Sequence, residues 1–227
     1  ISSGAELVIR HGLLPLVSLF VEPAKVLFLN NAVNHGIFSP IGIEQARETG
    51  QSIMFLLETN PGPGLGVLLA YWAFARGAAR SSAPGAIVIQ FFGGIHEIYF
   101  PYVLMRPAII VAPIVGSAAA ILFYSLTGTG LTAVASPGSI IAVAAMAPKG
   151  ETLLVLAGVV VAAAVSFFVA APIVKRAHLE EVKSVQKPNG TVIGGTSRAP
   201  RALEGPIRTV VFACDAGMGS SAMGATR

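Results

Sequence analysis

Long apolar runs dominate the chain as far as Val174, and they differ in how often polar residues interrupt them. The longest uninterrupted run, Thr152–Val174, has 23 residues without a charge. As a helix it would be about 34 Å long, which is enough to cross the hydrocarbon core of a bilayer. Ala108–Leu126 is a second run of sufficient length. The pattern predicts a mainly α-helical membrane protein.

The other apolar segments are shorter, or they are broken by charges, glycine and proline. Such a segment is not expected to lie free in lipid, because its polar groups need protein or water as partners. These segments are therefore predicted to be interfacial, broken or re-entrant helices of a polytopic transporter domain. They are Leu13–Leu29, Leu65–Ala75, Ala83–Phe100 and Val134–Ala147.

Polar stretches separate these segments and supply one candidate ion pair. Asn60–Gly64 predicts a break between helices, and Asn30–Ser39 predicts a polar loop. Glu22 and Lys25 are three residues apart, so their side chains are neighbours on a helix. A local ion pair is the favoured interpretation of these two charges.

Composition and charge exclude two broad classes of protein. Of the 227 residues, 54% are hydrophobic and only 11% are charged, whereas about a quarter of the residues in a soluble domain are charged. Residues 1–174 contain seven Lys or Arg and seven Glu, and residues 175–227 contain eight Lys or Arg and four acids. The positive excess after the last span predicts that this end lies in the cytoplasm. These basic residues are scattered and are not interleaved with aromatic residues, so nucleic acid is not an expected partner.

The tail beyond the last apolar run changes character twice. Residues 177–206 contain charges, glycine and proline, which predicts a flexible linker. Residues 207–227 include a short apolar stretch, Thr209–Ala213, that is typical of a buried β-strand, and then a loop and a helix start at Ser221. We therefore expect a membrane domain over residues 1–176, a linker, and the truncated start of an α/β domain. The chain begins with Ile1 and stops just after a helix start, so we expect it to be a fragment.

Cys214 is the single cysteine, so no internal disulfide is expected. Its position, in a glycine-containing loop between a strand and a helix start, is typical of a nest of backbone N–H groups that holds an anion. Such a nest would lower the pKa of the thiol and hold phosphate oxygens beside the thiolate. An inert cysteine in a turn is the alternative. The predicted phosphate loop continues with Asp215, Ala216, Gly217, Met218, Gly219, Ser220 and Ser221.

Two better-known kinds of phosphate loop do not fit this segment. A nucleotide-binding P-loop needs a lysine before its final Ser or Thr, and the loop has no lysine. A cysteine phosphatase loop ends on an arginine, where this chain has Ser220 and Ser221. The loop is therefore predicted to accept a phosphoryl group and to pass it on.

A histidine and a glutamate, His96 and Glu97, interrupt one apolar segment directly after two glycines. Ionisable residues in such a segment suggest a functional site, because they are costly to bury. A carboxylate can bind the hydroxyls of a polyol and can take a proton from an attacking hydroxyl. A structural ion pair, for instance with Arg106, is the alternative.

Amide and imidazole groups gather in the predicted polar loop, at Asn30, Asn31, Asn34 and His35. They could line a sugar site near membrane depth. They could equally cap helices, and residue chemistry leaves the two interpretations open.

Four sequence motifs together resemble the mannitol-specific enzymes II of the bacterial phosphoenolpyruvate-dependent phosphotransferase system. The resemblance runs from about His11 to the end of the chain, and the motifs occur in the same order across the linker. They are Asn30–Gly36, Asn60–Gly66, Gly93–Met105 and Ala213–Ala225.

The resemblance implies a role for each part of the chain. The membrane part, the C domain of the family, would bind and translocate the polyol, with Glu97 in the binding site and His96, His35 and Asn34 beside it. Cys214, in the B domain, would receive phosphate from a histidine of an A domain and pass it to the sugar, giving D-mannitol 1-phosphate. The protein would be a multi-pass homodimer in the bacterial cytoplasmic membrane with its B domain in the cytoplasm. No metal or cofactor is expected in this chain.

Two other functions fit parts of the sequence. A secondary polyol transporter would show the same broken helices but needs no reactive thiol. A membrane-tethered phosphatase or redox sensor would use the thiol without any dependence on sugar.

Overall fold

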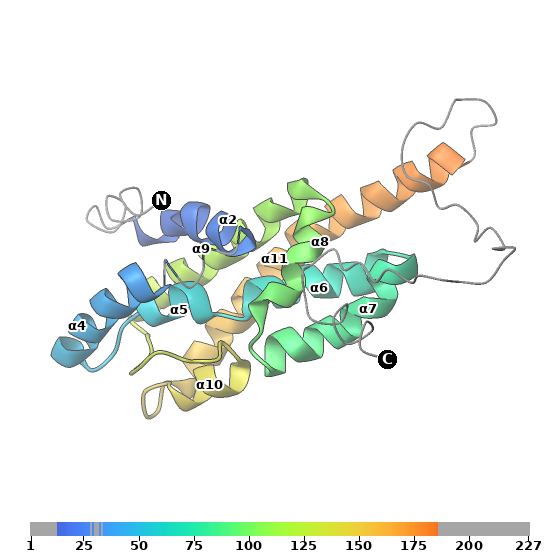
Figure 1. Cartoon of the computed structure of the whole chain (residues 1–227). Coiled ribbons are helices and arrows are strands. Elements are labelled where there is room, and N and C mark those ends of the chain that lie inside the picture. The colour runs from blue at the N-terminus through green and yellow to red at the C-terminus, as the bar shows by residue number, and fades with distance from the viewer. Residues whose placement is uncertain (1–12, 28, 30–31, 33, 186–227) are drawn as a thin grey trace, which may run out of the picture. The chain divides into compact units, whose positions relative to one another are not determined.

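The computed structural model describes residues 13–27, 29, 32 and 34–185, with side chains in the last helix as far as Ala177 (Figure 1). The chain divides into two units, Ile1–Ser184 and Val185–Arg227, and nearly all of the described residues belong to the first. The predicted strand, phosphate loop and helix start of the tail lie outside the described residues. No strand occurs in the described part, where Ser52 and Leu131 form an isolated antiparallel β-bridge.

The described part is helical, as the apolar pattern predicts. Longer helices alternate with short 3₁₀ and π segments, which are labelled η. In chain order the elements are η1 (Leu14–Val17), α2 (Ser18–Val26), η2 (Asn34–Phe38), α4 (Ser39–Thr49), α5 (Met54–Thr59), α6 (Gly62–Phe74), α7 (Gly77–Ile87), η3 (Val88–Phe92), η4 (His96–Tyr99), α8 (Phe100–Leu104), η5 (Pro107–Ile110), α9 (Val111–Thr127), α10 (Ile140–Ala145) and α11 (Thr152–Val185).

Two of the described helices are long and apolar enough to cross a membrane, and both are the ones that the sequence predicts. The first, Pro107–Thr127, has 21 residues, and the second, Thr152–Ala177, has 26. The helix α11 continues to Val185, into the segment for which the sequence predicts a linker. It remains helical there because charged residues that favour helices replace the apolar ones.

Small residues bring the long helices into close contact. The buried face of α11 carries Gly158, Ala162, Ser166 and Ala170 at intervals of four residues. A Cβ atom on Gly66 of α6 would lie 2.4 Å from the Ala163 carbonyl oxygen, and the Ser166 hydroxyl donates to the Pro63 carbonyl at 2.8 Å. Spacing of this kind lets helix backbones approach closely in a membrane.

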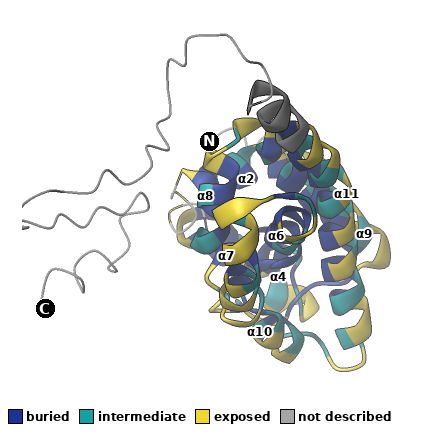
Figure 2. Cartoon of the chain, turned by 90° about the vertical axis from the view of Figure 1, so that its right-hand side faces the viewer, coloured by how far each residue is buried: buried dark blue, intermediate teal, exposed yellow. Residues whose placement is uncertain are grey.

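The same small face of α11 also receives α9. A Cβ atom on Gly116 would lie 2.7 Å from the Ala162 carbonyl oxygen, and the ring of Tyr124 fills the space beside Gly158. The earlier residue of α9, Gly116, lies near Ala162, and the later residue, Tyr124, lies near the earlier Gly158 of α11. The two helices are therefore antiparallel. In Figure 2, α6 lies among α7, α9 and α11, and most of its residues are buried.

The broken segments are short helices, as predicted, and one loop prediction is wrong. The break at Asn60–Gly64 separates α5 from α6, and the Asn60 carboxamide oxygen accepts from the Gly62 N–H at 2.9 Å. With 13 residues α6 is about 20 Å long, too short to span alone. Asn34–Ser39 is helical instead of forming a loop, because Ile37 and Phe38 anchor this turn in the core.

The predicted ion pair between Glu22 and Lys25 is confirmed, and it is completely buried. The Lys25 Nζ lies 2.9 Å from the Glu22 Oε1, and the two side chains are 2% and 0% exposed. Tyr99 donates to the other carboxylate oxygen at 3.1 Å, and Ser117 donates to Oε1 at 2.6 Å. The carboxylate of α2 is therefore held by groups from η4 and α9 as well as by its own helix.

Candidate functional site

A small polar pocket of about 130 Å³ lies where four separate segments of the chain meet. Asn34 and His35 come from η2, and the buried end of α5 supplies a second wall. The other two walls are the turn that leads into η4 and the loop between α9 and α10. The residues that line it are Asn34, His35, Glu58, Thr59, Gly94, His96, Glu97, Val134, Ala135, Ser136, Pro137 and Gly138.

Glu58 and Asn34 form one side of the pocket. The Asn34 Nδ2 donates to the Glu58 Oε2 at 2.9 Å, and the Asn34 Oδ1 accepts from the Ser39 hydroxyl at 3.2 Å. Since a carboxylate only accepts, this contact fixes which end of the amide faces Glu58. Both side chains are buried, so the pair holds a carboxylate in place at the wall of the pocket.

His96 is buried and is held by the opposite loop. Its Nε2 lies 2.8 Å from the Gly138 carbonyl oxygen, which can only accept, so Nε2 carries the proton. Burial is the main cause that lowers the pKa of His96 from its usual 6.5, and the positive charge of Lys25 lowers it further. The neutral ring then presents Nδ1 as a hydrogen-bond acceptor.

Glu97 follows His96 in the first turn of η4 and is only half-buried. The chain reaches it through Gly94, which has a positive φ of 74°. A Cβ atom on Gly94 would lie 2.7 Å from the Ser139 backbone nitrogen, so the turn fits against the loop opposite only with glycine. The break in the helix before η4 is what allows His96 and Glu97 to line the same pocket.

The pocket brings together four of the residues that the sequence proposes for polyol binding, namely Asn34, His35, His96 and Glu97. Asn30 and Asn31 lie outside the described residues. His35 is exposed and the role of each residue stays a prediction. The alternative partner of Glu97 in the sequence, Arg106, lines a different cavity beside Tyr71 and Arg76. Cys214 and the rest of the predicted phosphate loop, Asp215 to Ser221, lie outside the described residues.

Sequence reasoning missed Glu58, Thr59 and the turn Ser136–Gly138 as parts of this site. A signal for Glu58 was present, because this carboxylate follows the apolar stretch Ile53–Leu57 and lies two residues before the helix break at Asn60. The turn was predicted as a broken element, but nothing in its sequence says that it packs against His96.

The chemistry of the pocket suits a small polyhydroxy ligand. Carboxylates and the imidazole Nδ1 accept hydrogen bonds from hydroxyls, and amide groups can both donate and accept. The volume is below the 300–1,000 Å³ or so that is usual for drug-sized ligands. Among the described residues no group of three or more His, Cys, Asp or Glu is arranged to hold a metal ion.

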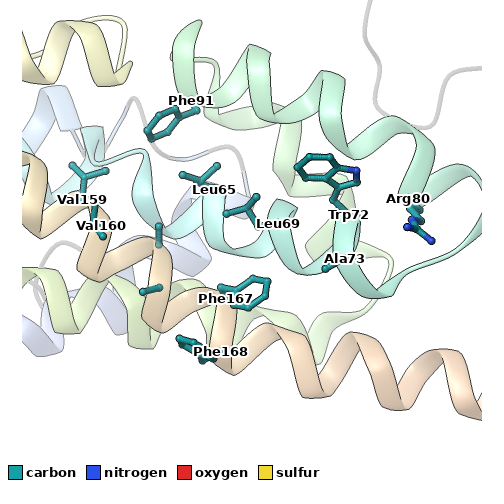
Figure 3. A pocket seen from close by; sticks show the side chains of 12 residues that line it. Leu65, Leu69, Trp72, Ala73, Arg80, Phe91, Val159, Val160, Phe167 and Phe168 are labelled. Atoms are coloured by element: carbon teal, nitrogen blue, oxygen red, sulfur yellow. The ribbon is translucent and has the colours of Figure 1, made fainter.

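The largest cavity among those described is elsewhere and has different chemistry. It is an open groove of about 730 Å³ between α6 and α11, which we call the α6–α11 groove (Figure 3). All but one of its lining residues are apolar or aromatic, so it offers almost nothing to hydroxyl groups. We therefore place the candidate polyol site in the smaller pocket.

Two apolar candidate spans, several broken helices and a polar pocket where four segments meet are typical of helical membrane transporters. Comparison with known proteins specifies the class further. The chain is similar along its whole length to mannitol-specific EIICB and EIICBA components of PTS systems.

Three relatives illustrate the extent of the similarity. The chain is 54% identical over its whole length to the "PTS system mannitol-specific EIICB component" of Geobacillus stearothermophilus, and it covers 50% of that protein. The Bacillus subtilis protein of the same name is also 54% identical, with 51% covered. The "PTS system mannitol-specific EIICBA component" of Escherichia coli is 50% identical, with 37% covered.

The chain thus spans about half the length of the EIICB relatives that it matches. No protein-family model matches the chain. No solved structure matches it either.

Proposed function

We propose that this chain is part of a mannitol-specific phosphotransferase that couples uptake of the polyol across the bacterial cytoplasmic membrane to its phosphorylation. The observation that carries the proposal is the similarity of the whole chain, at 50–54% identity, to relatives with that specificity. The product would be D-mannitol 1-phosphate. The functional protein would be a homodimer that takes its phosphate from a phosphorylated A domain.

In this proposal the polar pocket binds mannitol. Glu97 and Glu58 accept hydrogen bonds from the hydroxyls, and Asn34 and His96 fix the two walls. Glu97 is the better candidate for direct contact with the ligand. Its side chain is half-exposed at the pocket, whereas that of Glu58 is buried in the wall.

Cys214 is proposed to carry the phosphoryl group as a thiophosphate. A hydroxyl oxygen of the bound polyol attacks phosphorus, the new P–O bond forms, and the S–P bond breaks to release the thiolate. The hydroxyl proton passes to a carboxylate, for which Glu97 is the candidate. The sequence of the loop from Asp215 to Ser221 supports this role, since its glycines and the following helix start suit phosphate binding.

The distribution of charge supports an orientation in the membrane. One end of the antiparallel spans carries Arg76, Arg106, Lys175 and Arg176, and no acid occurs in residues 71–80, 98–110 or 152–177. The opposite end mixes both signs, with Glu44, Arg47, Glu48, Lys149 and Glu151. By the positive-inside rule the first end faces the cytoplasm, where a soluble phosphoryl donor would be found.

The proposal is tested by phosphoryl transfer from a phosphorylated A domain to the full-length protein, with mannitol as the acceptor. Cys214→Ser should abolish formation of mannitol 1-phosphate and leave mannitol binding, measured by equilibrium titration, unchanged. Competing hexitols in the same assay measure specificity.

Normal phosphorylation by the Cys214→Ser variant would contradict the proposed role of the thiol. Uptake of unmodified mannitol by the parent protein would favour the secondary transporter instead. Release of phosphate from Cys214 to water without any dependence on sugar would favour the phosphatase.

A further inference from the structure

The α6–α11 groove is unlike the polar pocket in every respect that decides what it can bind. Eleven of its twelve lining residues are apolar or aromatic, and the twelfth is Arg80. Several of them are widely exposed, with Trp72 at 49%, Val160 at 65% and Phe168 at 72%. A contiguous apolar surface of this kind in a membrane protein is covered by lipid or by another protein segment.

The cation lies at one end of the groove, as Figure 3 shows. Trp72 and Arg80 are at the end toward which α11 runs to Lys175, and Phe91 and Val159 are at the other end. The walls on α11, from Val159 to Phe168, lie in the middle of the span Thr152–Ala177. The groove therefore runs from the interior of the bilayer to its basic surface.

The surroundings of Arg80 favour an anion. Arg80 makes no ion pair with any residue that the structure describes. It lies in the first turn of α7, which contains no acid and no side-chain cap, so the backbone N–H groups there add positive potential. Arg76, at the start of the same helix, adds a second positive charge.

An apolar groove that ends in a guanidinium group matches an amphiphile with an anionic head. Guanidinium groups hold phosphate oxygens well, and basic pockets between membrane helices on the cytoplasmic side suit phospholipid head groups. Trp72 lines the same half of the groove as Arg80, where an aromatic ring near the level of the head groups is expected.

We propose that the α6–α11 groove binds one phospholipid of the cytoplasmic leaflet. One of its acyl chains lies along Leu69 and Phe167, and Arg80 holds its phosphate. The site is separate from the polyol pocket and does not depend on the proposed phosphotransferase activity. It depends on the chain being in a membrane in the orientation proposed above.

Native mass spectrometry of the full-length protein, purified in a mild detergent, tests the site directly. The parent protein should retain one phospholipid per chain. Arg80→Gln should retain about fivefold less, the change expected for a head-group contact of about 1 kcal/mol. Ala164→Phe, which places a ring on the exposed wall of the groove, should remove the lipid.

Two matched variants control for general effects of charge and bulk. Arg47→Gln removes an exposed cation from α4, and Ala145→Phe adds a ring to an exposed position of α10. Both should retain the lipid at the parent level. If Ala164→Phe does not fold, the comparison of Arg80→Gln with Arg47→Gln still decides the question.

Three results would overturn the proposal. The parent protein could retain no phospholipid, or Arg80→Gln could retain as much as Arg47→Gln. Finally, the parent protein could hold no lipid and the Ala164→Phe variant could differ from the parent in oligomeric state, which would show that a second copy covers the groove.

A second measurement uses added lipid. Phosphatidylglycerol added back to delipidated protein should raise the Tm of the parent more than the Tm of Arg80→Gln.

Discussion

Two glutamates of the membrane domain, Glu22 and Glu97, have opposite surroundings. Glu22 is fully buried and receives hydrogen bonds or charge from Lys25, Tyr99 and Ser117. Glu97 is half-exposed at a polar pocket that has room for a ligand. A carboxylate that is fully buried among donors of the protein stabilises the fold, whereas a carboxylate that lines a cavity can be reached by a ligand. The two differ although sequence alone presents both as charges in apolar segments.

The largest expected effect is a loss of protein stability when Glu22 loses its cationic partner. Lys25→Met leaves the Glu22 charge buried without its cation, so the free energy of unfolding should fall by about 3–5 kcal/mol. The Tm of the purified full-length protein and its yield from membranes measure this loss. The double variant Lys25→Met/Glu22→Gln should recover most of it, because no uncompensated charge remains. An unchanged Tm in the single variant would contradict the structural role of the pair.

Glu97→Ala should have the second largest effect, on binding. Loss of hydrogen bonds to a charged acceptor, worth about 1.5–3 kcal/mol, corresponds to about a 10- to 100-fold weaker affinity for mannitol. Equilibrium titration measures the affinity, and the Tm without ligand should stay within about 2 °C of the parent. The control is Glu48→Ala, an exposed carboxylate of α4 that should leave the affinity unchanged. Equal affinities in the two variants would remove Glu97 from the site.

The features of the fold that the sequence predicts are those that depend on residues close together in the chain. The apolar runs give both spanning helices to within a few residues, and Asn60–Gly64 gives the break between α5 and α6. The pairing of Glu22 with Lys25 also follows from spacing, because side chains three residues apart are neighbours on a helix. These features depend on composition and on near neighbours, so they are readable without tertiary structure.

Tertiary contacts decide what the sequence could not show. The contribution of Glu58 depends on Asn34, which is 24 residues away, and the position of His96 depends on Gly138, which is 42 residues away. The helical turn at Asn34–Phe38 replaces the predicted loop because its apolar residues are buried by other segments. Long-range pairing of this kind carries no local pattern.

The third largest effect is expected on the shape of the pocket, and it is measured by comparing Gly94→Ala with Gly150→Ala. Gly94 and Gly150 both have positive φ, but a Cβ on Gly94 would lie 2.7 Å from the Ser139 nitrogen, whereas Gly150 has open space around it. Alanine should cost about 1–2 kcal/mol of stability at Gly150, and more at Gly94, where the backbone of the opposite loop must also move. Only Gly94→Ala should also displace Glu97 and weaken mannitol binding, by about tenfold. Titration of both variants tests this, and equal binding would show that the turn does not position the site.

The smallest expected effect is on the pH dependence of stability. The lowered pKa of His96 means that the folded protein favours the neutral ring, while the unfolded chain takes up a proton near pH 6.5. The stability that depends on neutral His96 is therefore present above pH 6.5 and is lost as the pH falls toward the lower folded-state pKa. The Tm of the parent should fall more between pH 7.5 and pH 5.5 than that of His96→Asn. Parallel Tm curves would contradict the neutral state of this residue.

The glycine contacts of α6 and α9 with α11 have a mechanical consequence. With Gly62, Gly66 and Gly116 packed directly on α11 backbone carbonyls, these three helices have no space to slide or tilt past one another. They are expected to move as one rigid body. If the proposed polyol pocket moves relative to this body, the hinge is expected in residues 88–106, where the π segment and Gly93–Gly94 interrupt the helix.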